Sequence, residues 1–249
     1  MGFVIDMMRG VQCRAHYRIF DRWADRSLGI DASGLHRPEE LRLRGGNARH
    51  AVEYFGTPAL VFRRAISGID PRRFTFVDFG AGKGRALLLA AARPFLRVEG
   101  IELADTLHLE AERNIARAYE RGLMRAPVIT HHQDAAAYEL PPEPLILYLF
   151  NPFGAPVLDR VLDNVERSLR RSPRDIYAIY VNPEQAHCFE TRPNWQRMPR
   201  TPWQRMLDRL VSPWPIAIYR ALTPASQDRP AFLPIEPAPR RSRIWSAAH

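Results

Sequence analysis

The 249-residue sequence predicts an α/β protein in which helices flank a mostly parallel sheet. Two observations carry this prediction. Short, nearly uncharged apolar runs recur along the chain, most clearly at residues 74–79 and 145–150, and such runs are typical of strands buried on both faces. Alanine-rich or amphipathic stretches separate these runs, which is the pattern of a chain built from β-α-β units.

The clearest unit spans residues 74–102. A strand at 74–79 meets glycines at 80, 82 and 84, an alanine- and leucine-rich helix at 85–93 ends at Pro94, and a second strand ends at Glu102. Alternating glycines let the backbone turn sharply and leave bare N–H groups for a ligand. A carboxylate at the tip of the second strand can accept both hydroxyls of a ribose.

The spacing of these glycines separates the possible ligands. A dinucleotide site has G-x-G-x-x-G, whereas here the third glycine comes one residue early and Arg85 occupies the sixth position. A Walker loop would need a glycine at position 77 and Ser or Thr after Lys83, where the chain has Val77 and Gly84. The pattern that remains is D-x-G-x-G-x-G followed by an acidic residue on the next strand. A carboxylate such as Asp78 would repel a pyrophosphate but not an amino group.

This pattern resembles motif I of the class I S-adenosylmethionine-dependent methyltransferases, and V-D-F-G-x-G-K-G-R is similar to a broad bacterial group without an assigned acceptor. The resemblance covers roughly residues 54–221. It implies a seven-stranded Rossmann-like methyltransferase sheet, mostly parallel with an antiparallel last strand and flanked by helices, and S-adenosyl-L-methionine as the cofactor. The implied cofactor-binding residues are Asp78, Gly80, Gly82, Lys83, Gly84, Glu102, Asp134 and Asn151.

The resemblance also implies individual roles. Asp134 follows the third strand, where the family has an acidic residue that accepts the adenine amino group, although turn chemistry alone also explains an aspartate there. Tyr54 lies in a segment that in the family often closes over the methionine. Tyr54 or Glu53 is also a candidate to take the proton released from the acceptor.

A second informative stretch, Asn151-Pro152-Phe153-Gly154, directly follows the strand at 145–150. Ligands of open α/β sheets bind beyond the carboxyl ends of the strands. The stretch resembles the Asn/Asp-Pro-Pro-aromatic motif of amino methyltransferases with one proline missing, and the Asn and Phe of non-SET histone lysine methyltransferases. This implies that Asn151 orients a target nitrogen and that Phe153 frames it. Pro152 is expected to hold Asn151 in an extended conformation; a simple strand-ending turn remains the alternative.

Composition limits the classes of partner. The net charge of +9 comes from 36 basic residues, of which only Lys83 is a lysine, and they are spread along the chain. This favours a solvated mixed surface over a nucleic-acid face. We expect no membrane span and no signal peptide. Cys13 and Cys188 lack metal-ligand spacing, so we expect a reduced, cytoplasmic protein without a metal site.

The remaining elements complete the predicted organisation. A helix at 12–29 is expected to end at Gly29, with Ile19, Phe20 and Trp23 on its apolar stripe. Thr57 is expected to cap a helix that starts at Pro58. His131 and His132 should point to opposite faces of a strand. Strands at 195–198 and 215–221 should be antiparallel, with an arginine-rich insertion between them.

These elements predict three parts: an N-terminal helical extension or cap (1–52), a class I methyltransferase domain (53–222), and a disordered Pro/Arg-rich tail (223–249). The predicted function is methyl transfer from S-adenosylmethionine to an unidentified acceptor, with a nitrogen of a protein lysine or small-molecule amine ranked first. RNA is a less favoured acceptor. A catalytically silent binding module and a dehydrogenase are the other hypotheses, and the early third glycine argues against the dehydrogenase.

Overall fold

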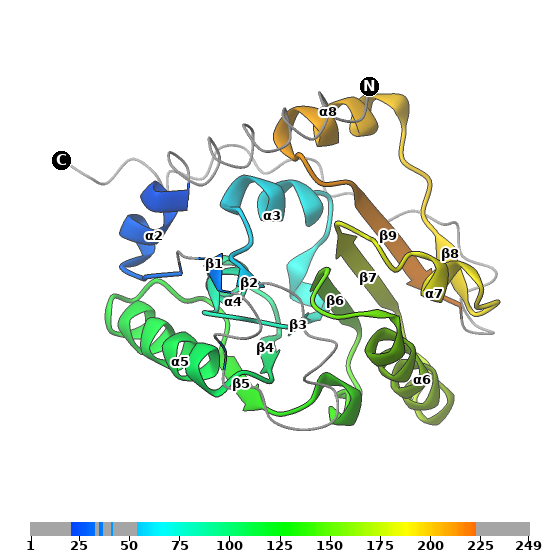
Figure 1. Ribbon diagram of the computed structural model, residues 1–249, viewed down its shortest axis with the longest axis horizontal. Coiled ribbons are helices and arrows are strands. Elements are labelled where there is room, and N and C mark those ends of the chain that lie inside the picture. Colours follow the sequence, from blue (N-terminus) through cyan, green and yellow to red (C-terminus); the bar gives the residue numbers. More distant parts are fainter. Residues whose placement is uncertain (1–20, 33–34, 37–40, 42–53, 223–249) are drawn as a thin grey trace.

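The computed structural model describes residues 21–32, 35–36, 41 and 54–222, with residues 35–36 described as backbone only (Figure 1). The predictions for residues 12–20, Glu53, Cys13 and the tail 223–249 lie outside this range.

A seven-stranded sheet in the order β5-β4-β3-β6-β7-β9-β8 organises the chain. The first five of these strands are parallel, whereas β9 is antiparallel to both β7 and β8. The predicted fold class is therefore confirmed. The strands are β3 (Thr75–Phe79), β4 (Arg97–Glu102), β5 (Val128–His132), β6 (Leu145–Phe150), β7 (Ile176–Val181), β8 (Trp195–Arg197) and β9 (Ile216–Ala221), with a separate pair formed by β1 (Leu35–His36) and β2 (Tyr54–Phe55).

Helices cover both faces of the sheet. Figure 1 shows α5 and α6 on opposite sides of it, and α3 next to α8. The helices are α2 (Arg22–Leu28), α3 (Ala59–Ala65), α4 (Arg85–Ala91), α5 (Asp105–Glu120), α6 (Ala155–Arg171), α7 (His187–Glu190) and α8 (Pro202–Val211), with short 3₁₀ turns η4 (Pro71–Arg73) and η5 (Ala135–Ala137). None of the helices in the described residues is long and apolar enough to cross a membrane.

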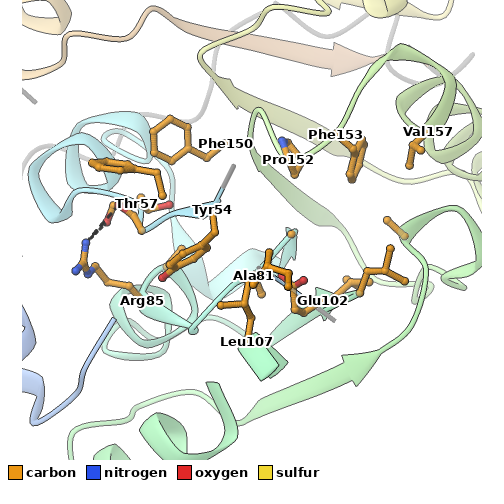
Figure 2. Close-up of a pocket in the computed structure, with 18 of the residues that line it drawn as sticks. Tyr54, Thr57, Ala81, Arg85, Glu102, Leu107, Phe150, Pro152, Phe153 and Val157 are labelled. Atoms are coloured by element: carbon orange, nitrogen blue, oxygen red, sulfur yellow. Dashed lines mark hydrogen bonds between the residues drawn. The ribbon is translucent and has the colours of Figure 1, made fainter. Parts of the chain in front are cut away.

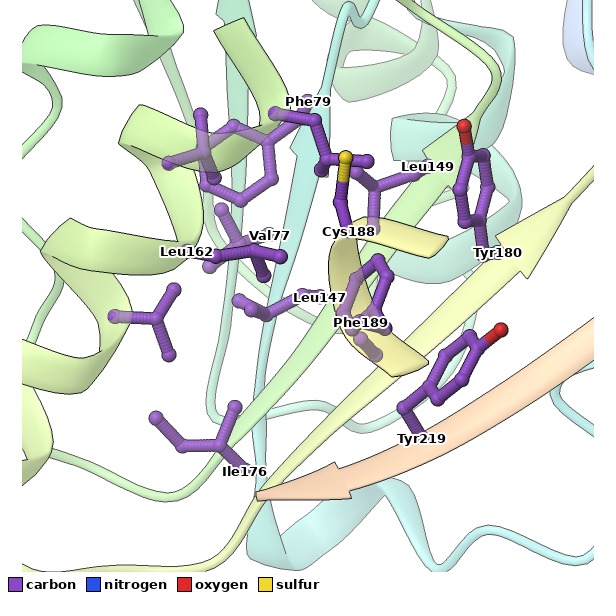
Figure 3. Packing of buried hydrophobic residues seen from close by; sticks show 14 of the residues in the cluster. Val77, Phe79, Leu147, Leu149, Leu162, Ile176, Tyr180, Cys188, Phe189 and Tyr219 are labelled. Atoms are coloured by element: carbon purple, nitrogen blue, oxygen red, sulfur yellow. The ribbon is translucent and has the colours of Figure 1, made fainter. Parts of the chain in front are cut away.

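Strand alternation divides the core into two layers. Val77 and Phe79 of β3 join the layer under α6 and α7, where Phe189 and Tyr219 also pack (Figure 3). Phe76, which precedes Val77 in sequence, packs with Phe62 of α3 on the other face. Burial on both faces explains why β3 and β6 are continuous apolar runs in the sequence.

Helix α2 differs from its predicted orientation. It ends at Gly29 as predicted, with Gly29 in the left-handed conformation at φ 67°. However, Trp23 is 53% exposed, whereas the charged residues Asp21 and Asp25 are buried. The prediction that Trp23 lies on the buried stripe is wrong, because the two carboxylates pair with a buried arginine of α4, Arg85.

The start of α3 also depends on α2. Pro58, not Thr57, is the residue before the helix, and neither supplies a side-chain cap. The backbone N–H of Ala59 donates instead to Asp21 Oδ1 at 3.0 Å. Since Asp21 is 38 residues away in sequence, a local interpretation of Thr57-Pro58 could not find this cap.

The arginine-rich insertion between β8 and β9 contains helix α8, which the sequence analysis did not predict. Thr201 and Gln204 form a capping box at its start. Asp208 accepts hydrogen bonds from Arg64 of α3 and from Arg200, so this insertion packs on α3.

The strand order reverses at β3, because β4 and β5 lie on one side of it and β6 and β7 on the other. Open α/β sheets bind ligands beyond the carboxyl ends of the strands at such a switch point. In this chain the glycine turn, the end of β4 and Asn151 all lie at that edge.

Candidate active site

A cavity that opens to solvent lies beyond the carboxyl ends of β3, β4, β5 and β6. The predicted site residues that line it are Tyr54, Gly80, Glu102, Asp134 and Phe153. The lining residues that the sequence analysis did not predict are Leu41, Phe55, Gly56, Thr57, Ala81, Arg85, Ala86, Ile101, Leu103, Leu107, Gln133, Ala135, Phe150, Pro152 and Val157. The structure therefore gathers residues from both informative stretches of the sequence around one cavity.

The cavity has two ends with Glu102 between them. In Figure 2, Tyr54, Thr57 and Phe150 lie toward one end, and Phe153 and Val157 toward the other. Glu102 lies on β4, which the sheet order places between β5 with Asp134 on one side and β3 with the glycine turn on the other. We call the end near Asp134, Phe153 and Val157 the β5 end, and the end near Tyr54, Thr57 and Phe150 the β3 end.

The glycine turn is shaped by contacts with two other segments. Gly80 has φ 78°, and a Cβ there would lie 2.5 Å from Cβ of Pro152. Gly82 has φ 54°, and a Cβ there would overlap the ring of Tyr54. Only glycine satisfies both the left-handed backbone and the close approach. Gly84 lies farther on, against α5, and does not line the cavity.

Glu102 is fixed by backbone N–H groups. Its Oε2 accepts from Gly82 N and its Oε1 from Ala104 N, each at 2.8 Å. Burial raises the pKa of Glu102, and these N–H donors act in the opposite direction by stabilising the carboxylate. A carboxylate has about four lone-pair sites, so each oxygen can accept a further hydrogen bond from a ligand in the cavity.

Asp78 lies beneath the cavity rather than in its lining. Its side chain is 3% exposed, and it faces Tyr148 across the β3–β6 register. Burial, and secondarily the nearby Glu102, raises the pKa of Asp78 to about 8. Asp78 is therefore mostly protonated at neutral pH and becomes a carboxylate under the β3 end only at higher pH or beside a bound cation.

Lys83 and Asp134 have different surroundings. The Lys83 ammonium pairs with Glu110 of α5 at 2.8 Å, and Lys83 does not line the cavity. Asp134 lines the β5 end and its Oδ1 also accepts from Ala136 N at 2.9 Å. The turn role of Asp134 is thus present, and the same residue also borders the space that a ligand would occupy.

Tyr54 forms part of the wall at the β3 end. Its hydroxyl donates to the carbonyl oxygen of Ala32 at 3.1 Å, and its ring packs on Gly82. Burial raises the pKa of Tyr54 far above its ordinary value. A phenol in this state stays protonated at neutral pH, which favours a packing role over proton abstraction.

Asn151 does not have the predicted extended conformation. Its φ is 42°, in the left-handed region, and its Oδ1 accepts from the Tyr180 hydroxyl at 3.1 Å. Asparagine tolerates this region better than most residues. Asn182, which follows β7 and also precedes a proline, has φ 53°. Asn151 is 9% exposed and does not line the cavity, whereas Pro152 and Phe153 do.

Phe150 and Phe153 lie toward opposite ends of the cavity. Phe153 belongs to the core layer under α6, near Ala135 and Val157. Phe150 instead meets Phe55 and Trp214, with ring centroids 6.2 and 5.0 Å away. We call Phe55, Phe150 and Trp214 the aromatic corner; it borders the β3 end, and the sequence analysis did not identify it.

Arg85 is a further lining residue that was not predicted as part of the site. In the sequence it stands out only because it breaks the dinucleotide spacing. In the structure it is buried, lines the cavity, and forms ion pairs with Asp21 and Asp25 of the N-terminal segment. No local signal marks such a pairing, because the partners are 60 or more residues away.

The adjacent histidines have the predicted opposite orientations. His131 Nε2 lies 2.8 Å from Glu99 Oε2, in a buried cluster with Tyr138. The ring of His132 instead stacks on His108 at a centroid distance of 5.1 Å. The two side chains cannot bind one metal ion together.

No protein-family model and no curated protein matches the sequence. Among solved structures, the chain is similar to the mitomycin 7-O-methyltransferase MmcR at 15% identity, covering 67% of this chain and 55% of that chain with a TM-score of 0.46. An RNA methyltransferase from Salinibacter ruber in complex with S-adenosyl-L-homocysteine has 18% identity, coverage of 67% and 92%, and a TM-score of 0.38. A precorrin 8W decarboxylase from Methanobacterium thermoautotrophicum has 19% identity, coverage of 66% and 88%, and a TM-score of 0.40. These likenesses concern the fold alone.

Proposed function

We propose that this chain binds S-adenosyl-L-methionine in the cavity and transfers its methyl group to an acceptor. The observation that carries the proposal is the position of Glu102. This buried carboxylate lies between the two ends of one cavity, is oriented by the glycine turn, and can accept further hydrogen bonds from ribose hydroxyls.

The two ends of the cavity fit the two halves of this cofactor. Leu103, Leu107 and Val157 give the β5 end apolar walls, and Asp134 and Gln133 give it a polar edge, which suits a purine. At the β3 end, the glycine turn lies over Asp78, a buried carboxyl group that would release its proton more readily beside an ammonium or sulfonium group, because a nearby cation stabilises the carboxylate.

The same charges disfavour a dinucleotide. A pyrophosphate at the β3 end would lie near the Glu102 carboxylate, and like charges at short distance repel. Glu102 and Asp78 therefore supply acidic groups near the place where NAD would carry its pyrophosphate, which supports the methyltransferase hypothesis over the dehydrogenase.

The bound cofactor would supply a methyl group on a positively charged sulfur. In the transfer, the acceptor–carbon bond forms as the sulfur–carbon bond breaks, the bonding electron pair goes to sulfur, and the acceptor nitrogen loses a proton to solvent. Such a reaction needs alignment and exclusion of water more than acid–base groups. The walls formed by Tyr54, Pro152 and Phe150 would provide both.

We propose a nitrogen acceptor, a protein lysine or a small-molecule amine, with RNA as the alternative. The aromatic corner borders the end where the methyl group would lie. Removal from water in the cavity disfavours an ammonium ion and so favours the neutral, nucleophilic amine. This removes the need for a base, a role that the protonated Tyr54 could not fill. Asn151 does not line the cavity, and it would act on the acceptor by fixing the turn that places Pro152 and Phe153 in the cavity wall.

Methyl transfer from radiolabelled S-adenosylmethionine tests this proposal. The full chain is incubated with lysine peptides, small primary amines and transcribed RNA in parallel, and both labelled product and S-adenosylhomocysteine are measured. We expect label in an amine-containing acceptor, and much less label with Glu102→Ala when S-adenosylmethionine is below saturation. Label in RNA alone would contradict a lysine or small-molecule amine as the acceptor and favour RNA. Tight cofactor binding without methyl transfer to any of these acceptors would support the silent binding module.

A further inference from the structure

Arg85 forms a buried set of ion pairs and hydrogen bonds beside the cavity. Its side chain is 1% exposed. Its Nε and Nη2 donate to the two carboxylate oxygens of Asp25, each at 2.8 Å. Its Nη1 lies 3.2 Å from Asp21 Oδ2, and 3.3 and 3.4 Å from the carbonyl oxygens of Gly56 and Thr57. Arg85 therefore joins helix α2 to the segment 54–57. We call Arg85, Asp21 and Asp25 the Arg85 clamp.

Other contacts of residues 21–32 also connect them to α3, Tyr54 and the glycine turn. Asp21 uses its second oxygen to accept from Ala59 N, which fixes the start of α3. The carbonyl oxygen of Ala32 accepts the Tyr54 hydroxyl. Asn114 of α5 binds the backbone of Asp31 and donates to the Lys83 carbonyl oxygen at 2.9 Å. Residues 21–32 thus connect the glycine turn to the wall that lies over it.

We propose that Arg85 is a positioning residue for the amino-acid end of the cofactor, an inference that rests on the proposed function. The clamp holds residues 54–57 against the glycine turn, and so sets the width of the β3 end. Arg85 acts through these residues rather than on the ligand, because both sides of its guanidinium fork are occupied by Asp25 and Asp21.

Stability alone is a poor explanation for this arrangement. A buried group of charges gains little over well-packed apolar side chains, since removing charges from water offsets most of their attraction. Unlike apolar side chains, the Arg85 guanidinium makes directional contacts. It contacts the carboxylates of Asp21 and Asp25 and also the carbonyl groups of residues 56 and 57.

The proposal predicts a difference between two ligands. S-adenosylhomocysteine would fill both ends of the cavity, whereas adenosine would fill only the β5 end and reach Glu102. Loosening the clamp should weaken the binding of S-adenosylhomocysteine and leave the binding of adenosine unchanged. A defect of general folding would weaken both.

The test measures the dissociation constants of both ligands by calorimetry on the full chain. Arg85→Lys keeps the charge but loses the two-pronged contact with Asp25. A triple variant, Arg85→Gln with Asp21→Asn and Asp25→Asn, removes the charges without leaving one buried and unpaired. If the ordered wall is then populated about a tenth of the time, affinity for S-adenosylhomocysteine falls about tenfold, whereas that for adenosine stays within about twofold of wild type.

A matched control is Arg174→Gln. Arg174 also binds several carbonyl groups, those of Pro141, Glu143 and Ser172 among them, but it precedes β7 at the opposite edge of the sheet. Its loss should lower the melting temperature and leave the ratio of the two affinities unchanged. Asp25→Asn tests the same role from the other side of the ion pair, and it should weaken the binding of S-adenosylhomocysteine if Arg85 positions the wall.

Several outcomes would overturn the inference. Equal weakening of both ligands, or no weakening of either in folded variants, would show that Arg85 only stabilises the fold. Tighter binding by Asp25→Asn would show that a freed Arg85 binds the ligand carboxylate directly. If the wild-type chain binds neither ligand, the proposed function itself fails. If the wild-type chain binds both ligands and the variants bind them with unchanged affinity, only the role of Arg85 fails.

Discussion

The ring of Tyr54 lies against Gly82, in the space that a Cβ at residue 82 would occupy. This contact joins the segment 54–57 to the glycine turn, so the absence of a side chain at residue 82 is required by the protein's own packing. Although Gly82 does not itself line the cavity, a substitution there acts on the cavity wall through Tyr54.

Gly82→Ala should therefore lower the free energy of unfolding by more than the strain of its backbone conformation alone. The left-handed conformation costs roughly 1–2 kcal/mol for alanine, and displacing Tyr54 should add about 1–3 kcal/mol of overpacking. Gly122→Ala is the matched control, because Gly122 has φ 65° but no atom lies within 4 Å of the place that a Cβ would take there. Chemical denaturation of both variants measures the difference. Equal losses would show that Tyr54 yields without cost.

Glu102→Ala should weaken binding of S-adenosylhomocysteine about tenfold to a hundredfold, since hydrogen bonds to a charged acceptor are worth roughly 1.5–3 kcal/mol. The control is Glu99→Gln on the same strand. Glu99 is also buried, but its partners are Arg97, His131 and Tyr138 and it does not line the cavity. Calorimetry should show near-normal affinity for this control. Unchanged affinity in a folded Glu102→Ala variant would remove Glu102 from the site.

Asp78 should make stability depend on pH. Its pKa is about 8 in the folded chain against an ordinary value of 3.8. Between these values the folded state holds a proton that the unfolded state has released, so stability falls as pH rises through this window. Asp78→Asn removes this contribution. The melting temperature of the variant minus that of wild type should therefore increase from about pH 4 to about pH 8; a constant difference would contradict the buried, protonated carboxyl group.

Asn151→Ala should leave affinity for S-adenosylhomocysteine nearly normal and lower methyl transfer on the order of a hundredfold, as expected for a lost positioning contact. Asn182→Ala is the control, because Asn182 shares the left-handed conformation and the following proline at the end of the next strand. Both variants should lose a similar amount of stability, and only the first should lose single-turnover rate. Equal rates would mean that Asn151 serves only its turn and its contact with Tyr180.

Much of the fold could be predicted because it depends on local sequence. Strands buried on both faces, such as β6, are continuous apolar runs, and the structure gives β6 the predicted bounds. The predicted end of β4 at Glu102 and the predicted antiparallel arrangement of β8 and β9 are also confirmed, although neither rests on a continuous apolar run.

The rest depends on contacts between distant residues. Asp25 looks like part of the polar side of a helix until Arg85, 60 residues later, is known to pair with it. A motif match favours Phe153 over Phe150, yet the left-handed turn at Asn151 sends the two rings toward opposite ends of the cavity. Helix α8 could have been predicted from local sequence, because Thr201 and Gln204 form a capping box and apolar residues then recur at helical spacing from Trp203 to Leu210.

Calorimetric titration of the wild-type chain with S-adenosylhomocysteine and with NAD, under identical conditions, tests the central claim most directly. The cavity, with Glu102 between an apolar β5 end and a β3 end over Asp78, predicts saturable binding of S-adenosylhomocysteine and much weaker or no binding of NAD. Tighter binding of NAD, or heat from neither ligand, would contradict it.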